Sequence, residues 1–339
     1  MFYMIGSWHQ AQFQTLLARK TRLPHALLIR GPEGIGKLAF ARALAQALLC
    51  ERPAADGSAC GACIACAWLG QGGHPDFRQL EPEGASQGGD EEQGGEKKAS
   101  VQIAVEQVRD LADFINLSSH RGGARVVLIH PAEALNLNAA NALLKNLEEP
   151  PPQTYFLLVA HRWHQLLPTI KSRCQQVVLP APDAGSARAW LKAQGSHDPE
   201  LAFAHSSGAP LLALKFDEDY WRARELLLDR IAASDFDPLD AAEQLRDLAP
   251  PLAVALLQKW SFDLAFHKVT GSVRYNPDRA ETVAAVAARL DALAALRFHR
   301  QLVRLQRVIH HPLNPRLFLE QLFLSYAELL RGHDLKQAA

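Results

Sequence analysis

The stretch that decides the fold is Gly31-Pro32-Glu33-Gly34-Ile35-Gly36-Lys37. An apolar run at 26–29 comes directly before it, and a helical pattern at 37–49 begins at its last residue. A glycine-rich turn of the form G-x-x-x-x-G-K between a strand and a helix can cradle phosphate with backbone N–H groups, the helix N-terminus and the lysine. The alternative is a tight connection without a ligand. This context favours a phosphate loop that binds through Gly31, Gly34, Gly36 and Lys37.

Strand and helix patterns alternate around this loop. Further apolar runs predict strands at 77–80, 126–129, 155–159 and 176–179. Helical patterns lie between several of them, notably at 105–115 and 139–147. Such alternation is typical of a parallel sheet that is covered by helices on both faces. We therefore expect residues 1–182 to form an α/β P-loop core with a parallel five-stranded sheet.

The strand signals end after Pro180-Ala181-Pro182, where a hinge is expected. Short helices at 185–195 and 199–206 predict a small helical domain over 183–219. From Tyr220 onward, apolar residues recur at i, i+3 and i+4, which predicts an all-helical domain over 220–332. Its helices are expected at 226–233, 241–248, 252–267, 281–308 and 315–331, the last capped by Asn314 with Pro315 in its first turn.

Composition limits the classes of function. A chain of 339 residues suits two or three domains. Its 36 basic and 36 acidic side chains cancel, so overall charge does not indicate a dedicated binder of nucleic acid or membranes. No apolar run approaches the ~20 residues of a membrane span, and residues 1–15 lack a secretion signal, which predicts a cytoplasmic protein. Residues 81–100 are mostly Gly, Glu, Gln and Lys and are predicted to form a disordered surface insertion.

Two positions that ATP hydrolysis needs are altered. The residue after a phosphate-loop lysine normally supplies a hydroxyl to Mg²⁺, but here it is Leu38. The strand at 126–129 should be followed by an acidic residue, but His130-Pro131 follow, and Glu133 lies about one helical turn too far along. The sequence therefore predicts a nucleotide-binding fold without the reaction. Residual nucleotide binding through Gly36 and Lys37 stays open.

Four of the five cysteines lie close together with the spacing C-x9-C-x2-C-x2-C: Cys50, Cys60, Cys63 and Cys66. Two-residue gaps let neighbouring thiolates turn onto one tetrahedral Zn²⁺, and four thiolates leave no open position for catalysis. This pattern favours a metal site in a reducing compartment over a disulfide framework. We expect a structural zinc module at about 50–66, inserted into the core. The alternatives are unligated thiols, a redox pair or an iron-sulfur cluster.

Two more motifs follow the cysteines: Asn141-Ala142-Leu143-Leu144-Lys145-Asn146-Leu147-Glu148-Glu149-Pro150-Pro151 and Ser172-Arg173-Cys174. In this order, and over nearly the whole chain, the motifs resemble the δ′ subunits of bacterial DNA polymerase III, which belong to the clamp-loader AAA+ family. The γ/τ-type ATPase subunits share the cysteine module and the Leu-Leu-Lys-x-Leu-Glu-Glu-Pro-Pro run. They would keep a Thr, an Asp-Glu pair and an Arg where this chain has Leu38, His130-Pro131 and Leu211.

The resemblance implies an AAA+ core, a helical lid domain and a helical collar domain that joins subunits. It implies a non-hydrolysing subunit that helps to load the sliding clamp onto primed DNA, beside γ/τ-type ATPase subunits and a δ subunit. Polymerase activity would belong to the complex. By the same resemblance, Arg173, flanked by Ser172 and Cys174, reaches the ATP of a neighbouring subunit as an arginine finger.

Several alternatives stay open beside this interpretation. Arg173 could instead pair with a surface carboxylate, as many arginines do. The chain could be an active γ/τ-type clamp-loader ATPase or another AAA+ ATPase, or a zinc-stabilised interaction module unrelated to replication. Arg162, near the end of the strand at 155–159, is a weaker candidate for a functional arginine, and a surface role is favoured for it.

Overall fold

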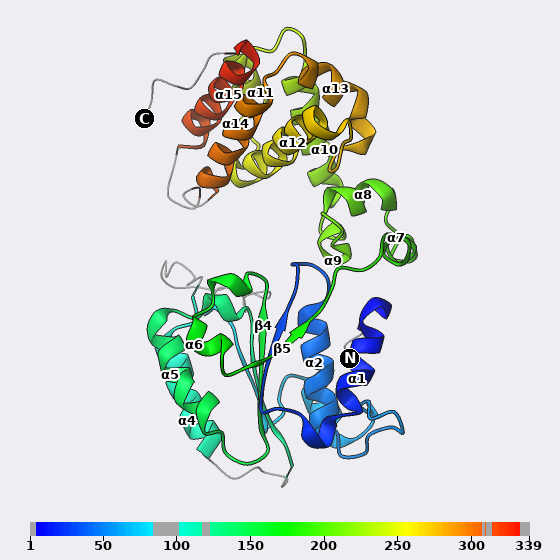
Figure 1. The fold of residues 1–339 in the computed structure, drawn as a ribbon, viewed down its shortest axis with the longest axis vertical. Helices are drawn as coiled ribbons and strands as arrows, with labels where there is room; N and C mark the ends of the chain where they lie inside the picture. Colours follow the sequence, from blue (N-terminus) through cyan, green and yellow to red (C-terminus); the bar gives the residue numbers. More distant parts are fainter. Residues whose placement is uncertain (1–4, 84–101, 117–122, 307–308, 310–313, 333–339) are drawn as a thin grey trace. The chain divides into compact units, whose positions relative to one another are not determined.

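The computed structural model describes residues 5–83, 102–116, 123–306, 309 and 314–332. The insertion predicted at 81–100 therefore lies outside the described residues from 84 onward. The chain divides into two compact units, Met1–Ser186 and Ala187–Ala339, which are coloured from blue to green and from green to red in Figure 1.

The first unit is built on one sheet of five parallel strands in the order β2-β3-β4-β1-β5. The strands are β1 (Ala26–Arg30), β2 (Phe77–Leu80), β3 (Arg125–Ile129), β4 (Thr154–Ala160) and β5 (Gln175–Val178). In the centre of the sheet, Leu28 of β1 is level with Leu158 of β4 and with Gln176 of β5. The five-stranded parallel sheet predicted from the sequence is confirmed.

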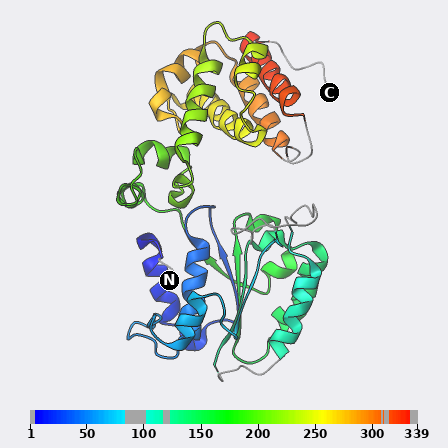
Figure 2. The ribbon, with the colours of Figure 1, turned by 180° about the vertical axis from the view of Figure 1, so that it is seen from behind.

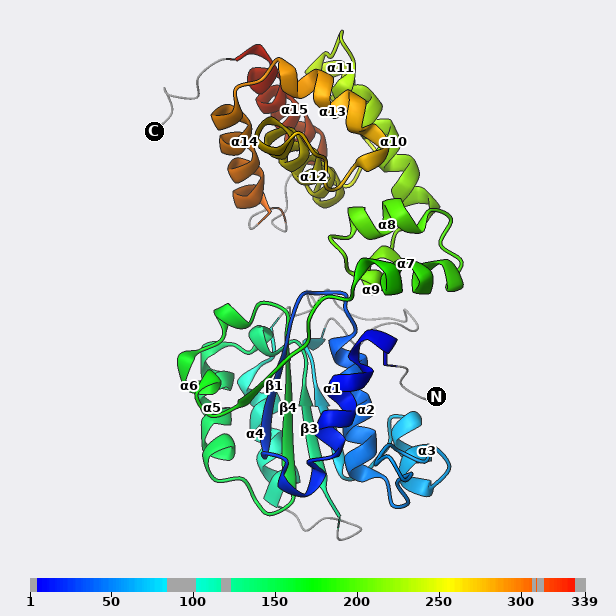
Figure 3. The ribbon, with the colours of Figure 1, turned by 45° about the vertical axis from the view of Figure 1, so that its right-hand side comes forward.

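Helices cover both faces of this sheet. Figures 1 and 3 show α1 (Gln10–Leu17) and α2 (Lys37–Leu49) on one face, and α4 (Val105–Asn116) and α5 (Leu137–Glu148) on the other. Figure 2 shows the same two layers from behind. Successive strand residues point to opposite layers: Leu27 packs into the cluster with α1 and α2, and Leu28 packs into the cluster with α4 and α5. Burial on both faces explains why the inner strands β1, β3 and β4 are almost uninterrupted apolar runs, whereas the edge strands β2 and β5 are partly polar and exposed.

The second unit is helical in its described residues. Three short helices come first: α7 (Ala184–Ala193), α8 (Pro199–His205) and α9 (Pro210–Ala213), of which α7 begins just before the boundary between the units. Longer helices follow: α10 (Glu218–Ala232), α11 (Pro238–Gln244), α12 (Pro250–Thr270), α13 (Ala280–Ala288), α14 (Ala292–Leu305) and α15 (Pro315–Arg331). Among the described residues, no helix has the length and apolar character that crossing a membrane requires.

The core of the second unit centres on Trp260 of α12 and Tyr326 of α15, which are both fully buried. The indole N–H of Trp260 donates to the Tyr326 hydroxyl at 2.9 Å, and that hydroxyl donates to the backbone oxygen of Ile231 at 3.1 Å. These bonds satisfy the polar atoms of two large core side chains. As predicted, α15 begins after Asn314, whose side chain accepts hydrogen bonds from the N–H groups of Arg316 and Leu317.

One predicted helix is wrong. The sequence pattern indicated a continuous helix at 281–308, but α13 ends at Ala288 and α14 begins at Ala292. The carboxylate of Asp291 accepts a hydrogen bond from the N–H of Ala294 at 2.8 Å and so caps a new helix. An Asp inside an apolar period competes for the backbone in this way. The four-residue helix α9 was also missed, because it is too short to show a period.

Buried charged groups hold the connection between α12 and α13. The carboxylate of Asp263 accepts hydrogen bonds from the backbone N–H groups of Arg274, Tyr275 and Asn276 at 2.8 to 3.2 Å. The buried guanidinium of Arg224 donates to the side-chain oxygen of Asn276 and to the carboxylate of Asp278. These hydrogen bonds fix the connection, which contains only the short 3-10 helix Pro277–Arg279.

A directed chain of hydrogen bonds runs beside this connection. His205 is 1% exposed, and its Nδ1 lies 3.0 Å from the backbone oxygen of Tyr275, so Nδ1 donates because a carbonyl only accepts. Its Nε2 then accepts from the Tyr220 hydroxyl at 2.8 Å, and that hydroxyl accepts from the Lys259 ammonium at 2.8 Å. Burial lowers the pKa of His205 to about 2, so the ring stays neutral in the folded protein.

This burial of His205 predicts how stability depends on pH. The pKa of His205 is depressed in the folded state, so its contribution is present above pH ~6.5 and is lost as pH falls, because only the unfolded chain takes up the proton. From about pH 7.5 to about pH 5.5, this residue should remove about 1.4 kcal/mol from the free energy of unfolding. In His205→Gln, urea titrations followed by circular dichroism should show a pH dependence weaker by that amount.

The matched control is His197→Gln, because His197 is exposed. This variant should keep the wild-type pH dependence. An unchanged pH dependence in His205→Gln would contradict the proposed neutral state of the buried ring.

Candidate functional site

The glycine-rich loop connects β1 to α2 as predicted. Gly36 caps α2 with a φ of 99°, in the left-handed region that favours glycine. A Cβ on Gly31 would overlap the backbone oxygen of Leu179. Both glycines are therefore required by the backbone, and α2 begins with its free N–H groups at the loop, which is the arrangement that phosphate binding uses.

The side chain of Lys37 contacts the backbone of its own loop. Lys37 is 2% exposed, and its ammonium donates a hydrogen bond to the backbone oxygen of Pro32. Burial lowers the pKa of Lys37 to about 8, while the charges of Glu33 and Glu133 oppose that shift. Leu38, at the position where Mg²⁺ would need a hydroxyl, packs against the apolar cluster of α1 and α2.

Two histidines meet where β3 and β4 end. His130 directly follows β3, His161 directly follows β4, and their Nε2 atoms lie 3.1 Å apart. One nitrogen donates and the other accepts, so the neutral pair shares one proton between the two Nε2 atoms. Burial lowers the pKa of His130 to about 4, and the charge of His161 adds to this effect. Burial, followed by the charge of Lys37, also lowers the pKa of His161. The strand ends thus carry a neutral imidazole pair.

The acidic side chain that follows β3 is bound to backbone. The Glu133 side chain is 2% exposed, and its oxygens accept from the N–H of His161 at 3.0 and 3.2 Å. One of them also accepts from the N–H of Arg162 at 2.8 Å. The guanidinium of Arg162 is largely exposed, with its Nε 4.0 Å from Glu133. The carboxylate of Glu133 therefore joins the segment after β3 to the segment after β4.

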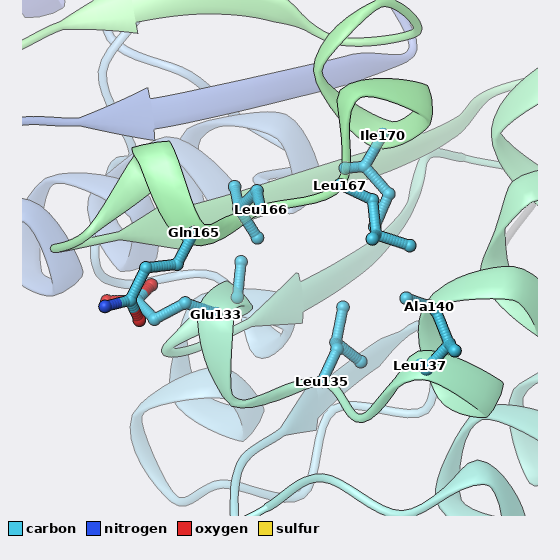
Figure 4. Close-up of a pocket in the computed structure, with 9 residues that line it drawn as sticks. Glu133, Leu135, Leu137, Ala140, Gln165, Leu166, Leu167 and Ile170 are labelled. Carbon is cyan, nitrogen blue, oxygen red and sulfur yellow. The ribbon is translucent and has the colours of Figure 1, made fainter. Parts of the chain in front are cut away.

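A small pocket lies beside Glu133 (Figure 4). Leucine, isoleucine and alanine side chains line most of it, with Glu133 and Gln165 close together at one end. Its volume of about 130 Å³ is below the roughly 300 Å³ at which pockets for drug-sized ligands begin. We therefore assign no nucleotide to this pocket.

The Ser172-Arg173-Cys174 motif joins the short helix α6 (Pro168–Lys171) to β5. Cys174 is buried in the core and burial raises the pKa of its thiol to about 12, so it anchors the motif. Arg173 donates from Nε to an oxygen of Glu148 at 2.6 Å, and its NH2 contacts the same oxygen. Its NH1 donates to the backbone oxygen of Thr169 at 3.0 Å. An ion pair between Arg173 and a carboxylate was the alternative to an arginine finger. This ion pair is present in the single chain.

The four clustered cysteines converge on one point. Their sulfur atoms all lie within 4.8 Å of one another, and the Cys50 and Cys63 sulfurs are 3.9 Å apart. Tetrahedral thiolates at ~2.3 Å from Zn²⁺ would lie ~3.8 Å from one another, so the cluster can accept a metal ion of this kind. Backbone N–H groups of Cys60 and Cys63 donate to sulfurs within the cluster. Cys50 ends α2 and Cys63 caps α3 (Ile64–Gly70), and all four cysteines are free of disulfides.

The predicted residues thus form three separate groups. The first group is the phosphate loop with Lys37, together with His130 and Glu133, which follow β3. The four cysteines form the second group, and Arg173 with Glu148 forms the third. Sequence reasoning missed His161 and the partners of Glu133. The position of His161 was a usable signal, because residues directly after parallel strands meet at the carboxyl edge of the sheet.

Comparisons with known proteins show the family of the chain. The sequence profile of the family described as "DNA polymerase III, delta subunit" matches residues 9–183. The DNA polymerase III subunit delta′ of Pseudomonas aeruginosa is 41% identical over 279 residues, which cover 78% of this chain and 79% of that protein. The subunit delta′ of Escherichia coli is 37% identical over 67% of this chain and 65% of that protein. The Escherichia coli subunit tau is 35% identical, but over only 50% of this chain and 24% of that protein.

A solved structure shows the shared AAA+ fold. The DNA polymerase III gamma subunit-related protein of Thermotoga maritima aligns with a TM-score of 0.51 and 21% identity, over 94% of this chain and 100% of that chain. The family resemblance that the motifs indicated is confirmed by the sequence comparisons, and the solved structure shows the same fold. From the profile match and the identity to subunits named delta′, this chain belongs to the family of δ′ subunits of DNA polymerase III.

Proposed function

We propose that this chain is a clamp-loader subunit that does not hydrolyse ATP and that supplies Arg173 to the ATP of a neighbouring subunit. In this role it helps to load the sliding clamp onto primed DNA, together with γ/τ-type ATPase subunits and a δ subunit. Membership in the δ′ family supports the assembly, as does the partial identity to a tau subunit.

The observation that carries the proposal is the neutral imidazole pair at the ends of β3 and β4. ATP hydrolysis needs a metal at the phosphates and an acidic or polar group that holds the metal or orients the water. His130 and His161 occupy the strand ends, and Glu133 is engaged by two backbone N–H groups. Freeing Glu133 would break its hydrogen bonds to the half-buried N–H of His161 and to the N–H of Arg162. Such an arrangement supports a chain without its own hydrolysis.

The chain's own nucleotide is not needed for this role. Gly31, Gly34 and Gly36 keep the loop shape that phosphates use, and the ammonium of Lys37 has donors besides the one that bonds to Pro32. Binding without turnover is compatible with these groups, since the defects lie in metal binding and water activation.

Arg173 has the chemistry that a finger requires. Its guanidinium is always charged, and its planar fork matches phosphate oxygens. The side chain is 32% exposed, while its neighbour Cys174 fixes the backbone in the core. Fingers of this kind contribute ~10³ to 10⁵ in rate. A chain with an altered site of its own can therefore control the site of a neighbour.

We infer that the cysteine cluster holds Zn²⁺ in a structural role. Four sulfur ligands within 4.8 Å of one another would complete a tetrahedral zinc site and leave no position for water or substrate. The metal would hold the segment between α2 and α3, through Cys50, Cys60, Cys63 and Cys66. An iron-sulfur cluster remains the alternative occupant.

Purified chain should hydrolyse ATP only at the background rate, because histidines and not acids directly follow β3 and β4, and Glu133 is held by backbone N–H groups. Lys37→Ala should leave that rate unchanged. A phosphate-release assay with excess Mg²⁺ measures both. A clear rate in the wild type that Lys37→Ala abolishes would identify an active ATPase instead.

Arg173→Ala should reduce the ATPase of a reconstituted clamp loader to near background, with a loss of ~10³-fold or more at the site that Arg173 serves. Gel filtration should show that the complex still assembles. Arg162→Ala is the matched control, because this arginine is exposed and contacts no phosphate in the proposed mechanism. Wild-type ATPase activity in an assembled Arg173→Ala complex would contradict the proposal that Arg173 is an arginine finger. Failure of the chain to bind any γ/τ-type or δ subunit would contradict the clamp-loader role.

The metal proposal predicts one zinc per chain in freshly purified, reduced protein, measured by elemental mass spectrometry. Cys60→Ser should lose the metal and melt at a lower temperature, because metal binding contributes to folding. Cys174→Ser should keep the metal, since this cysteine lies in the core away from the cluster. Iron in place of zinc, or a Cys60→Ser variant of unchanged stability, would contradict the structural zinc site.

A further inference from the structure

The contact between Arg173 and Glu148 has a geometry that bears on the finger. Glu148 is the last residue of α5, and Arg173 lies 25 residues further along the chain. A carboxylate in the last turn of a helix faces the negative end of the helix dipole, which is unfavourable for the helix. The position of Glu148 is therefore not explained by helix stability. The ion pair with Arg173 offsets this unfavourable position.

The contact uses the edges of the guanidinium that a phosphate would need. Nε and NH2 both face one oxygen of Glu148, and NH1 faces the backbone oxygen of Thr169 and, at 3.4 Å, the Ser172 hydroxyl. A guanidinium binds carboxylate and phosphate through the same planar fork. Arg173 cannot present this fork to a neighbour's ATP while Glu148 occupies it.

We propose that Glu148 is an internal competitor for the phosphates, a latch that holds the finger against α5 until ATP in the neighbouring subunit displaces it. This inference rests on the proposed role of Arg173 as a finger. In the free chain the fork lies on Glu148. In the assembled complex, the greater negative charge of the triphosphate draws the fork away, and the carboxylate of Glu148 returns to solvent.

The exposure of the pair sets the strength of the latch. The side chains of Arg173 and Glu148 are 32% and 48% exposed, so water screens their attraction. Exposed ion pairs typically change an equilibrium by only about two- to five-fold. The value of kcat/KM follows the fraction of chains in which the finger is free, because it compares the free enzyme with the transition state. The latch thus moderates the neighbour's ATPase and does not block it.

The test is the steady-state ATPase of a reconstituted clamp loader that contains the full chain. Glu148→Gln removes the charge but keeps the shape, and it should raise kcat/KM for ATP about two- to five-fold. Glu149→Gln is the matched control, because it removes the same charge from the exposed neighbour, and it should behave as wild type. The double variant Glu148→Gln/Arg173→Ala should equal Arg173→Ala, since the latch acts only through the finger.

The possible results distinguish the role of Arg173 as a finger from the role of Glu148 as its latch. If Glu148→Gln equals or falls below wild type while Arg173→Ala is near background, Arg173 is a finger but Glu148 does not restrain it. An unaffected Arg173→Ala complex overturns the finger itself. If Glu148→Gln does not fold, Glu148→Asp replaces it. The shorter side chain should loosen the ion pair and give a smaller increase in kcat/KM, and the absence of any increase overturns the latch.

A second measurement uses the free chain. The Nε–H resonance of Arg173 should shift in Glu148→Gln and stay in place in Glu149→Gln.

Discussion

The burial of both faces of a parallel sheet is the constraint on which the first unit depends. Because α1 and α2 cover one face and α4 and α5 the other, each strand is followed by a loop at the same edge. The phosphate loop after β1, His130 after β3 and His161 after β4 are brought to that edge by topology alone. The same topology can therefore carry a working ATPase or an altered one, and the identity of a few residues at the edge decides between them.

The two most distinctive parts of this unit are joined by one helix. Lys37 is the first residue of α2, and Cys50 is the residue that ends it. Thirteen residues at ~1.5 Å each make α2 about 20 Å long, and most of its side chains are buried. The cysteine cluster and the phosphate loop are thus held at opposite ends of one packed element. The cluster belongs to the scaffold of the loop and is too far from it to take part in its chemistry.

The sequence carried the features that depend on local pattern. The strands, α2, the cap of α15 by Asn314 and the convergence of the four cysteines were predicted from spacing and residue type, because each depends on neighbours a few residues away. The break before α14 was missed, since Asp291 sits within an apolar period and only its hydrogen bond reveals the new helix. The contacts of His130 with His161 and of Arg173 with Glu148 join residues more than twenty positions apart. No local pattern distinguishes such pairs from other pairs of compatible side chains.

The buried carboxylate of Glu133 also bears on which substitutions could give this chain an ATPase site. An acid introduced at position 130 would replace an imidazole with a carboxylate as the partner of His161 and bring a second carboxylate into the site where Glu133 is buried. A hydroxyl at position 38 alone would add only one metal ligand, since histidines and not acids directly follow β3 and β4. Neither single substitution therefore supplies a complete metal site. If the chain does not hydrolyse ATP, as proposed, a gain of that activity would require substitutions at positions 38 and 130 together.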